Sequence, residues 1–352
     1  MRNCIGILGG NGSIGKNVVL ALQNLIENKK IMVATRKKIS KIDANNLQYE
    51  YLDINHNKQL ESYCLQCSTI INCVGPSSII RDKIAKICLT TKTNYIEVSG
   101  EYNLCYEIKK FDESFYKRKI NCVYSAGVNP GLVEALISFY LERYNDSKAI
   151  EVYFTGAGDF SYSASLDMID SCRAPDNKGM SFIENGKVRN VNNFNYVKDL
   201  PQPAGRMFCI PVINDHFAKC IKEHKIQRAF FYNAFKTTDI ISSMFEARNS
   251  DSSLEIKDIA YRLSKSFEKE KLLYEKEFTA IYFKIYSENI LTKRMIYYGD
   301  WNRLTGIIAA IVAIGVEQGK IKRNGVGEIW DSLNMEWFYK KIVEIKDMVL
   351  DV

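Results

Sequence analysis

A glycine-rich turn near the start of the chain is the feature most suited to bind a ligand. An apolar run, Cys4 to Leu8, leads into Gly10-Asn11-Gly12-Ser13-Ile14-Gly15, and helical spacing of apolar residues follows from Lys16 to Leu25. In a strand–turn–helix unit of this kind, the first glycine allows the tight turn, the second lets backbone approach a pyrophosphate, and the third lets helix and strand pack closely. The helix N-terminus adds N–H donors and a positive dipole end. We therefore expect all six residues of the turn to contact a dinucleotide cofactor.

The end of the next apolar run indicates which nicotinamide cofactor fits. Ile31 to Thr35 is predicted to be a strand, and Arg36, Lys37 and Lys38 follow it. An NAD site would place Asp or Glu here to hold the ribose 2′-hydroxyl, whereas arginine can hold a 2′-phosphate bidentately and stack on adenine. We therefore predict that Thr35, Arg36 and Lys37 bind NADP, with NAD less favoured. A solvated, charged loop is the alternative.

Small and polar residues also follow two later predicted strands. Asp53 closes the third strand, where it could meet the adenine amine or cap the next turn. Val74, Gly75 and Pro76 follow the fourth strand, where backbone without bulky side chains would let the ribose and nicotinamide pass. Both positions agree with ligand binding beyond the carboxyl ends of parallel strands.

The fifth predicted strand supplies titratable groups. Tyr95 and Glu97 lie on it, and Gly100 and Glu101 follow it. A carboxylate facing a nicotinamide site could orient a substrate ammonium or move a proton, although capping of the next helix is an equal alternative. We assign proton handling to Glu101 first and then to Tyr95, substrate contact to Glu97, and cofactor contact to Gly100.

The second half of the chain offers fewer specific signals. Asn129 begins a predicted hinge between domains and is expected to touch the cofactor. Asp159, a third candidate for proton handling, opens a polar cluster that includes Ser161, a candidate for substrate binding. Arg173 and Arg206 could clamp a substrate carboxylate, and exposed salt bridges are the alternative for each.

No metal site is predicted. Cys64-Leu65-Gln66-Cys67 forms a CxxC, but no second pair or histidine stands at zinc-ligand spacing. Several of the ten cysteines lie inside apolar runs, where cysteine behaves as a small buried hydrophobe. A reducing compartment is therefore expected, and we predict a cytoplasmic protein.

These candidates have to be positioned by an alternating pattern of strands and helices. The predicted strands of the first third also include Leu47 to Asp53, Ser68 to Val74, Asn94 to Val98 and Ile120 to Ser125, and the predicted helices include Ser77 to Leu89 and Asn103 to Lys119. Such alternation implies right-handed crossovers and a doubly wound parallel sheet. The fold class is therefore α/β, with an N-terminal Rossmann domain over residues 1–128.

The pattern changes after Pro130 and predicts an α+β domain with a mainly antiparallel sheet over residues 129–300. Its predicted elements are a helix at Gly131 to Tyr144, strands at Ile150 to Thr155, Arg206 to Ile213, Gln227 to Phe235 and Glu277 to Tyr286, a hairpin turn at Asn185-Gly186, and covering helices at Thr238 to Arg248 and Ile256 to Tyr274. Residues 301–352 are mostly helical and are expected to return to the first domain.

Composition limits the class of partner. The chain has 352 residues, 46% of them hydrophobic and 25% charged, which suits two globular domains. A net charge of +7 fits an anionic cofactor, and no RNA-binding signature or long basic tract accompanies it. No signal peptide is visible, and the apolar run Gly306 to Val316 is too short to cross a bilayer. We expect a small-molecule substrate, no nucleic acid, no membrane, and a homodimer through the antiparallel sheet.

Taken in order, these motifs resemble the saccharopine dehydrogenase-like reductases. The residues that carry the resemblance are GILGGNGSIG, INCVGP (Ile71 to Pro76), YIEVSGE (Tyr95 to Glu101), SAGVNPGL (Ser125 to Leu132), LTGIIAAI (Leu304 to Ile311) and Gly325-Val326. The resemblance implies an NAD(P)-dependent oxidoreductase with a Rossmann domain and an α/β substrate domain. It also implies that Gly10, Gly12 and Gly15 hold the pyrophosphate, that Gly75-Pro76 approach the cofactor, and that Gly100-Glu101 lie near the nicotinamide.

Members of that family typically handle C–N bonds of amino-acid conjugates, and some related proteins reduce C=C bonds in trans to a synthase. We therefore predict an NADP-dependent reductase that delivers hydride to an imine of an amine or amino-acid-derived substrate. A trans-acting enoyl reductase and a non-catalytic NADP-binding regulatory protein are the alternatives.

Overall fold

The computed structural model describes residues 2–26, 28–36, 46–192 and 196–351. They form two compact units, Met1–Ala135 with Asn302–Lys341 and Leu136–Trp301 with Ile342–Val352. The division falls inside the helix α7 (Leu132–Arg143), a few residues after the predicted boundary at 128. Among the described residues, no helix combines the length and the apolar composition that a membrane span needs.

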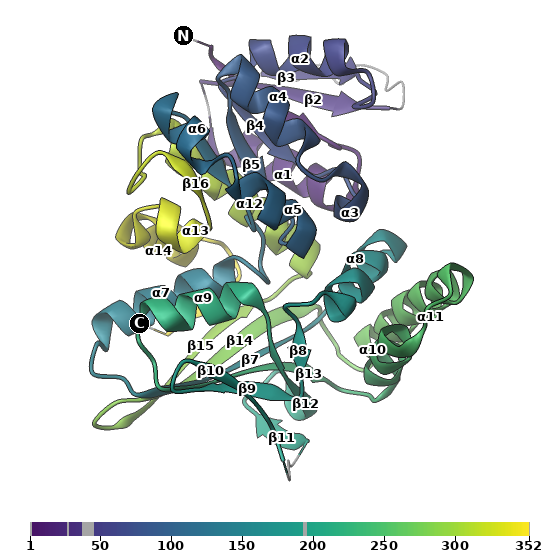
Figure 1. The fold of residues 1–352 in the computed structure, drawn as a ribbon, viewed down its shortest axis with the longest axis vertical. Helices are drawn as coiled ribbons and strands as arrows, with labels where there is room; N and C mark the ends of the chain where they lie inside the picture. Colours follow the sequence, from purple (N-terminus) through teal and green to yellow (C-terminus); the bar gives the residue numbers. More distant parts are fainter. Residues whose placement is uncertain (1, 27, 37–45, 193–195, 352) are drawn as a thin grey trace. The chain divides into compact units, whose positions relative to one another are not determined.

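The first unit is built on a parallel sheet of seven strands in the order β16-β6-β5-β4-β1-β2-β3 (Figure 1). The strands are β1 (Cys4–Leu8), β2 (Lys30–Thr35), β3 (Leu47–Tyr51), β4 (Thr69–Asn72), β5 (Asn94–Glu97), β6 (Asn121–Val123) and β16 (Gly325–Gly327). This is the predicted doubly wound sheet, with one strand added from the C-terminal part of the chain. The strand order reverses between β1 and β4, which is where such sheets bind ligands.

Helices cover both faces of this sheet. The helices of this part of the chain are α1 (Ser13–Leu25), α2 (Asn57–Gln66), α3 (Ser77–Ile80), α4 (Lys83–Thr91), α5 (Tyr102–Lys109), α6 (Asp112–Lys117), α12 (Trp301–Glu317), α13 (Ile329–Ser332) and α14 (Met335–Val343). One core lies between the strands and α2, α4, α5 and α6. Elsewhere α12 crosses α1 closely, since a Cβ added at Gly306 would lie 2.6 Å from the Cβ of Asn17.

Two predicted helices are each broken into a pair. The helix expected over Ser77 to Leu89 stops at Arg81, whose φ of 50° is left-handed and cannot continue a right-handed helix. The helix expected over Asn103 to Lys119 breaks before Asp112, whose carboxylate accepts a hydrogen bond of 2.7 Å from the Val326 N–H of β16. The first break follows from the backbone conformation of one residue and the second from a distant contact, and local periodicity records neither.

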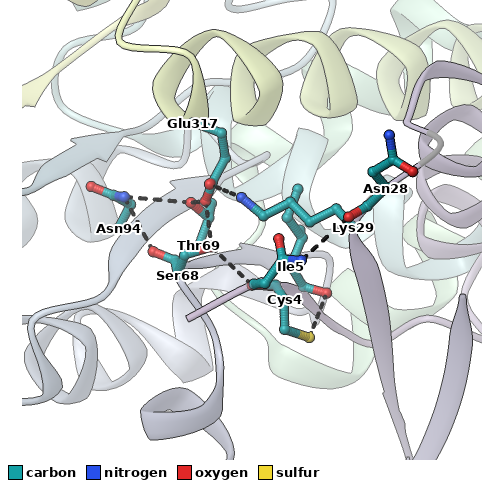
Figure 2. A network of polar contacts seen from close by, with 9 residues as sticks. Cys4, Ile5, Asn28, Lys29, Ser68, Thr69, Asn94 and Glu317 are labelled. Atoms are coloured by element: carbon teal, nitrogen blue, oxygen red, sulfur yellow. Dashed lines mark hydrogen bonds and ion pairs between the residues drawn. The ribbon is translucent and has the colours of Figure 1, made fainter. Parts of the chain in front are cut away.

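Glu317 fastens the end of α12 to the amino ends of the strands (Figure 2). Its carboxylate accepts hydrogen bonds from Ser68 Oγ, at 2.7 Å, and from Thr69 Oγ1, and it pairs with the ammonium of Lys29. Ser68 also donates, through Oγ, to the carbonyl of Cys4 at 3.0 Å. One acidic side chain therefore joins α12 to β1, to β4 and to the residue before β2.

The second unit is built on a mixed sheet of ten strands, and among the neighbouring strands that the structure describes, β7 and β13 form a parallel pair while the other pairs are antiparallel. The strands are β7 (Ala149–Ala157), β8 (Lys178–Gly179), β9 (Ser181–Glu184), β10 (Lys187–Asn190), β11 (Val197–Leu200), β12 (Gly205–Ile213), β13 (Arg228–Phe235), β14 (Phe278–Tyr286), β15 (Ile290–Tyr297) and β17 (Met348–Leu350). The predicted hairpin at Asn185-Gly186 joins β9 to β10, and both turn residues have positive φ, as a type I′ turn requires.

Helices α7 and α9 (Asp215–Glu223) cover one face of this sheet (Figure 1). The ring of Tyr140 in α7 packs edge-on against Phe283 of β14, with centroids 5.2 Å apart, and Phe217 of α9 lies 5.6 Å from Phe231 of β13. Helix α9 thus covers the sheet, a position for which the sequence analysis predicted the helices at Thr238 to Arg248 and Ile256 to Tyr274.

The helices predicted to cover the sheet, α10 (Asp239–Asn249) and α11 (Ser253–Lys271), instead pack with α8 (Tyr162–Arg173). Their shared core contains Ile169, Ile240 and Leu263 and meets the sheet at Phe235. The predicted C-terminal segment 301–352 also differs from the structure, because residues 342–352 belong to the second unit, where β17 pairs with β15.

The Glu317 contacts predict a measurable loss of stability. Replacing Glu317 with Gln removes the charge that balances Lys29 in a site where both side chains are less than 20% exposed. We expect the free energy of unfolding to fall by about 1–3 kcal/mol, below the range for a fully buried pair. Urea denaturation followed by circular dichroism measures this change. Glu113→Gln, which breaks an exposed pair with Lys117, is the control and should leave the curve unchanged. Equal effects would contradict the assignment.

Candidate cofactor site

The glycine turn joins β1 to α1 with no space for side chains at two of its positions. A Cβ at Gly15 would lie 2.2 Å from the carbonyl oxygen of Gly9, and one at Gly10 would lie 2.1 Å from Cγ1 of Val33. At Gly12 the nearest atom, the Gly9 oxygen, is 3.3 Å away. Packing therefore requires the first and third glycines, while a Cβ at the second would meet a single atom within 4 Å, which leaves its other sides for the approach of a pyrophosphate.

Gly9 is a further requirement that the sequence analysis missed. Its φ of +76° is in the left-handed region, and a Cβ there would lie 2.9 Å from the carbonyl oxygen of Cys73. Gly9 also accepts the Gly12 N–H at 3.0 Å, which closes the turn. The doubled glycine, Gly9-Gly10, was the available signal. Helix α1 then begins at Ser13 with no side-chain cap and no acidic residue in its first turn.

The turn is tied to the end of β2, where the cofactor-selecting residues were predicted. Asn11 Nδ2 donates to Thr35 Oγ1 at 2.6 Å, and the Gly10 N–H donates to the Ala34 carbonyl at 3.3 Å. Arg36 comes next and is exposed. The structure therefore brings the glycine turn and the start of the basic segment together, whereas Lys37 lies outside the described residues.

Asp53 has the capping contacts that were one of its two predicted roles. Its Oδ1 accepts the Asn55 N–H at 2.9 Å, and its carbonyl accepts the His56 N–H at 3.0 Å. These bonds organise the turn before α2. Its contact with adenine stays a prediction.

A buried carboxylate, Glu97, connects the loops that follow β4 and β5. Its Oε2 accepts Asn72 Nδ2 at 2.8 Å, and Asn72 Oδ1 accepts the Val74 N–H at 3.1 Å, which shapes the Val74-Gly75-Pro76 turn. Its Oε1 accepts the Ser99 N–H at 2.9 Å. Glu97 is only 1% exposed, so its side chain is placed to position both turns.

Tyr95 donates its hydroxyl to the same Glu97 carboxylate. The ring is fully buried, and burial, reinforced by the charge of Glu97, raises the Tyr95 pKa well above its usual value. Tyr95 and Glu97 thus form one buried pair beneath the loop after β5. The roles predicted for them in proton handling and substrate contact stay predictions.

Glu101 caps helix α5. Its Oε1 accepts the Asn103 N–H at 3.0 Å, and its Oε2 accepts the Leu104 N–H at 2.8 Å. The alternative raised from the sequence, a helix cap, is therefore present, and proton handling by Glu101 stays a prediction. Gly100 beside it is required by packing, because a Cβ there would lie 2.2 Å from Cγ of Pro130. This contact places Gly100 next to the Asn129-Pro130 segment.

The polar cluster of the second unit lies at the start of α8. Asp159 is ion-paired with Lys271 at 2.7 Å, and its carbonyl accepts the indole N–H of Trp301 at 2.8 Å. Ser161 caps α8, because its Oγ accepts the Ala164 N–H at 3.1 Å. Both residues thus have structural contacts, and their predicted roles stay predictions.

The two candidate arginines lie on separate elements of the second unit. Arg173 ends α8 and approaches Asp251 at 4.0 Å, which is the salt-bridge alternative for this residue. Arg206 is exposed on β12, opposite Asp199 of β11. The structure therefore does not gather the substrate candidates of this unit into one cluster. Among the residues that the structure describes, no group of three or more His, Cys, Asp or Glu could hold a metal ion.

The part of the chain that contains the glycine turn is similar to a known domain family. Residues 5–123 match the family model for the saccharopine dehydrogenase NADP binding domain. Residues 5–123 therefore form an NADP-binding domain of the saccharopine dehydrogenase type. The chain is an NAD(P)-dependent oxidoreductase, and its cofactor is NADP. Over this domain the match confirms the resemblance predicted from the ordered motifs, and it confirms the cofactor predicted from the basic segment after β2.

Solved structures of saccharopine dehydrogenase-like fold extend the similarity to both units. The chain resembles the apo saccharopine dehydrogenase (L-Glu forming) of Saccharomyces cerevisiae at 13% identity, with a TM-score of 0.66, over 99% of this chain and 100% of that one. A meso-DAP dehydrogenase mutant of Clostridium tetani, solved with DAP, is 15% identical with a TM-score of 0.51, over 96% of each chain. At these identities the similarity shows the fold. No curated protein matched the chain.

The packing of the turn predicts that replacing Gly12 affects mainly cofactor affinity, whereas replacing Gly15 affects mainly stability. Gly12→Ala should fold with little change in melting temperature, because its Cβ meets only one atom, while the Kd for NADPH should rise at least about tenfold. Differential scanning fluorimetry and NADPH fluorescence titration measure the two effects. Gly179→Ala, at another uncrowded glycine, is the control and should change neither. Gly15→Ala should lower the melting temperature. Normal NADPH affinity in a folded Gly12→Ala protein would exclude a cofactor above this turn.

Proposed function

We propose that this chain is an NADP-dependent reductase that transfers hydride to the C=N bond of an imine formed from an amine or amino-acid-derived substrate. The observation that carries the proposal is the NADP-binding turn at the switch point of a sheet whose fold, together with the second unit, matches a saccharopine dehydrogenase over 99% of the chain. The comparison proteins are described as an L-Glu-forming saccharopine dehydrogenase and a DAP dehydrogenase. Similarity over both units favours a substrate of that amino-acid class over an enoyl substrate.

The residues proposed to hold the cofactor follow the carboxyl ends of β1, β2, β4, β5 and β6. The six residues of the glycine turn would hold the pyrophosphate, and Thr35 and Arg36 would hold the ribose 2′-phosphate. Val74-Gly75-Pro76, with Gly100 and Asn129, would border the ribose and nicotinamide. The single close neighbour of the Gly12 Cβ position and the exposed side chain of Arg36 support this fit.

When bound, NADPH supplies the hydride, and the protein has to orient it against the carbon of the C=N bond. Glu97 contributes as a positioning residue, because its hydrogen bonds hold Ser99 directly and Val74 through Asn72. Glu101 is the first proposed group for handling the proton at nitrogen, and Tyr95 or Asp159 is the next. Glu97, Ser161, Arg173 and Arg206 are the proposed substrate contacts.

We also propose a cytoplasmic homodimer formed through the sheet of the second unit. Side chains alternate between the faces of a strand, so the face opposite α7 and α9 carries Phe182, Phe230, Tyr232 and Tyr153. Their rings form a continuous row, with successive centroids 4.7, 5.7 and 4.6 Å apart. Tyr153 and Tyr232 are buried within the chain, whereas Phe182 and Phe230 are half-buried, so the Phe182–Phe230 end of the row is the part that supports pairing with a second copy.

Arg36 provides the test of cofactor selection. Arg36→Ala should weaken NADPH binding by about 1–3 kcal/mol, the cost of losing a charged hydrogen-bond partner, and leave NADH binding unchanged. Fluorescence titration with each cofactor gives both constants. Lys30→Ala removes a charge from the opposite end of β2 and is the matched control, for which neither constant should change. Equal losses for NADPH and NADH would contradict the 2′-phosphate assignment.

Turnover tests the reaction itself. With NADPH present, we expect cofactor oxidation only when an amine or amino acid and a 2-oxo acid or aldehyde are supplied together, because the imine forms from both. The absorbance of NADPH follows the reaction, and each component alone is the control. Oxidation by an enoyl thioester without an amine would favour the C=C alternative. Tight NADPH binding without oxidation across both panels would favour a non-catalytic binding protein.

A further inference from the structure

Six cysteine thiols gather in the core of the first unit, and the proposed function uses none of them. All six are at most 5% exposed, none is in a disulfide, and they belong to one cluster: Cys4, Cys64, Cys67, Cys88, Cys105 and Cys122. The CxxC that the sequence analysis set aside supplies two of these thiols. Buried thiols are ordinarily unreactive, so a reactive pair within this cluster would have to differ from the other thiols in its contacts and pKa values.

Cys4 and Cys67 are in direct contact. The thiol of Cys67 donates a hydrogen bond to the sulfur of Cys4 at an Sγ–Sγ distance of 3.9 Å, although the residues are 63 positions apart. A disulfide needs about 2 Å between the sulfurs, so closing the bond requires the two sulfurs to approach by about 2 Å. The space is made by Gly6, where a Cβ would lie 2.7 Å from the sulfur of Cys67.

The backbones on both sides of this contact are held firmly. The Ser68 N–H and Oγ donate to the Cys4 carbonyl at 2.8 and 3.0 Å. Arg2 donates to the Cys67 carbonyl at 3.2 Å and to Thr93 Oγ1 at 2.9 Å. Figure 2 shows that the segment carrying Cys4 is also joined, through Ser68, to the Glu317 network. The backbone hydrogen bonds on both sides therefore hold the two thiols in contact.

The environment distinguishes the two sulfurs. The hydrogen bond from Cys67 lowers the pKa of Cys4, with further lowering by the Met32 N–H and by the charges of Lys29 and Lys30, against the effect of burial. The same hydrogen bond, together with burial, raises the pKa of Cys67. Cys4 is thus the better nucleophile and Cys67 the thiol beside it, the relation that an attacking and a resolving cysteine require.

For two other thiols of the cluster the surroundings act in the opposite direction to that at Cys4. Burial, followed by a hydrogen bond with Cys64, raises the pKa of Cys88 well above its usual value. Burial and the charge of Glu97 do the same for Cys122. Cys4 also begins β1, whereas Cys88 and Cys122 lie inside a helix and a strand.

We propose that Cys4 and Cys67 are a peroxide-oxidisable dithiol that closes to an intramolecular disulfide. In the first step the Cys4 thiolate attacks one peroxide oxygen, the O–O bond breaks, and hydroxide leaves a sulfenic acid on Cys4. The Cys67 sulfur then attacks the Cys4 sulfur, the S–O bond breaks, and water leaves. Overall, two thiols lose two electrons and two protons, and one peroxide is reduced to two waters.

The disulfide would lie away from the proposed cofactor site. Cys4 begins β1 and Cys67 precedes β4, whereas the glycine turn and Gly75-Pro76 follow the far ends of these parallel strands. We therefore expect oxidation to leave the Kd for NADPH within about twofold. Because the bond closes a long loop, it should raise the melting temperature by several degrees.

The experiment treats the reduced full-length protein with a small excess of hydrogen peroxide and then counts thiols and maps disulfide-linked peptides. Two of the ten thiols should be lost, a Cys4–Cys67 linked peptide should be found, and dithiothreitol should restore both thiols. NADPH titration before and after treatment confirms that the protein stays folded. The mapping needs only the unmodified chain, so it holds even if a cysteine variant fails to fold.

Variants sharpen the assignment. Cys4→Ser and Cys67→Ser should each abolish the linked peptide, and Cys88→Ser, which removes another buried thiol of the same cluster, should leave it intact. A Cys64–Cys67 or Cys64–Cys88 linkage would overturn the proposal. So would ten intact thiols under conditions that fully oxidise glutathione.

Discussion

The close approach of Gly15 to the carbonyl of Gly9 is the constraint on which the cofactor end of the first unit depends. With a Cβ only 2.2 Å from that oxygen, any side chain at Gly15 would push α1 away from the turn. The start of α1 sets where its N–H donors point, and the turn below it is tied to β2 by Asn11 and Thr35. One contact between backbones thus sets the helix start, the turn and the end of β2 together.

Two carboxylates, one buried and one less than 20% exposed, serve opposite ends of the same sheet. Glu97, at the carboxyl end of β5, accepts from Tyr95, Asn72 and Ser99 and so links the loops that border the cofactor. Glu317, near the amino ends, links β1, β4 and Lys29 to α12. A buried carboxylate is costly unless it is fully bonded, so each one strongly restricts the loops or helix that supply its donors. The sheet is thereby held at both ends by polar contacts as well as by its core.

Local sequence patterns were enough to predict the parallel sheet, the glycine turn and the basic segment after it, because each is encoded within about thirty residues. The breaks at Arg81 and before Asp112 were missed, since the second depends on Val326, 214 positions away. The same limit explains why β16 and β17 were absent from the prediction. Glu97 and Glu101 were predicted as candidates because they lie at and just after the end of β5. Their hydrogen-bond partners could be identified only from the structure. These partners show that Glu97 links two loops and that Glu101 caps a helix.

Hydrogen bonding also restricts how the proposed reaction can handle its proton. The Tyr95 hydroxyl donates to Glu97, the Glu101 oxygens accept backbone N–H groups, and Asp159 is paired with Lys271. Each group would have to give up a bond before it could exchange a proton with a substrate, at a cost of about 1–3 kcal/mol when the partner is left buried. An imine that binds as its iminium already carries the proton on nitrogen, so hydride transfer then needs orientation more than acid catalysis. A C=C substrate has no such proton and would need a donor at carbon. The engaged state of all three groups therefore fits a C=N substrate better than an enoyl one.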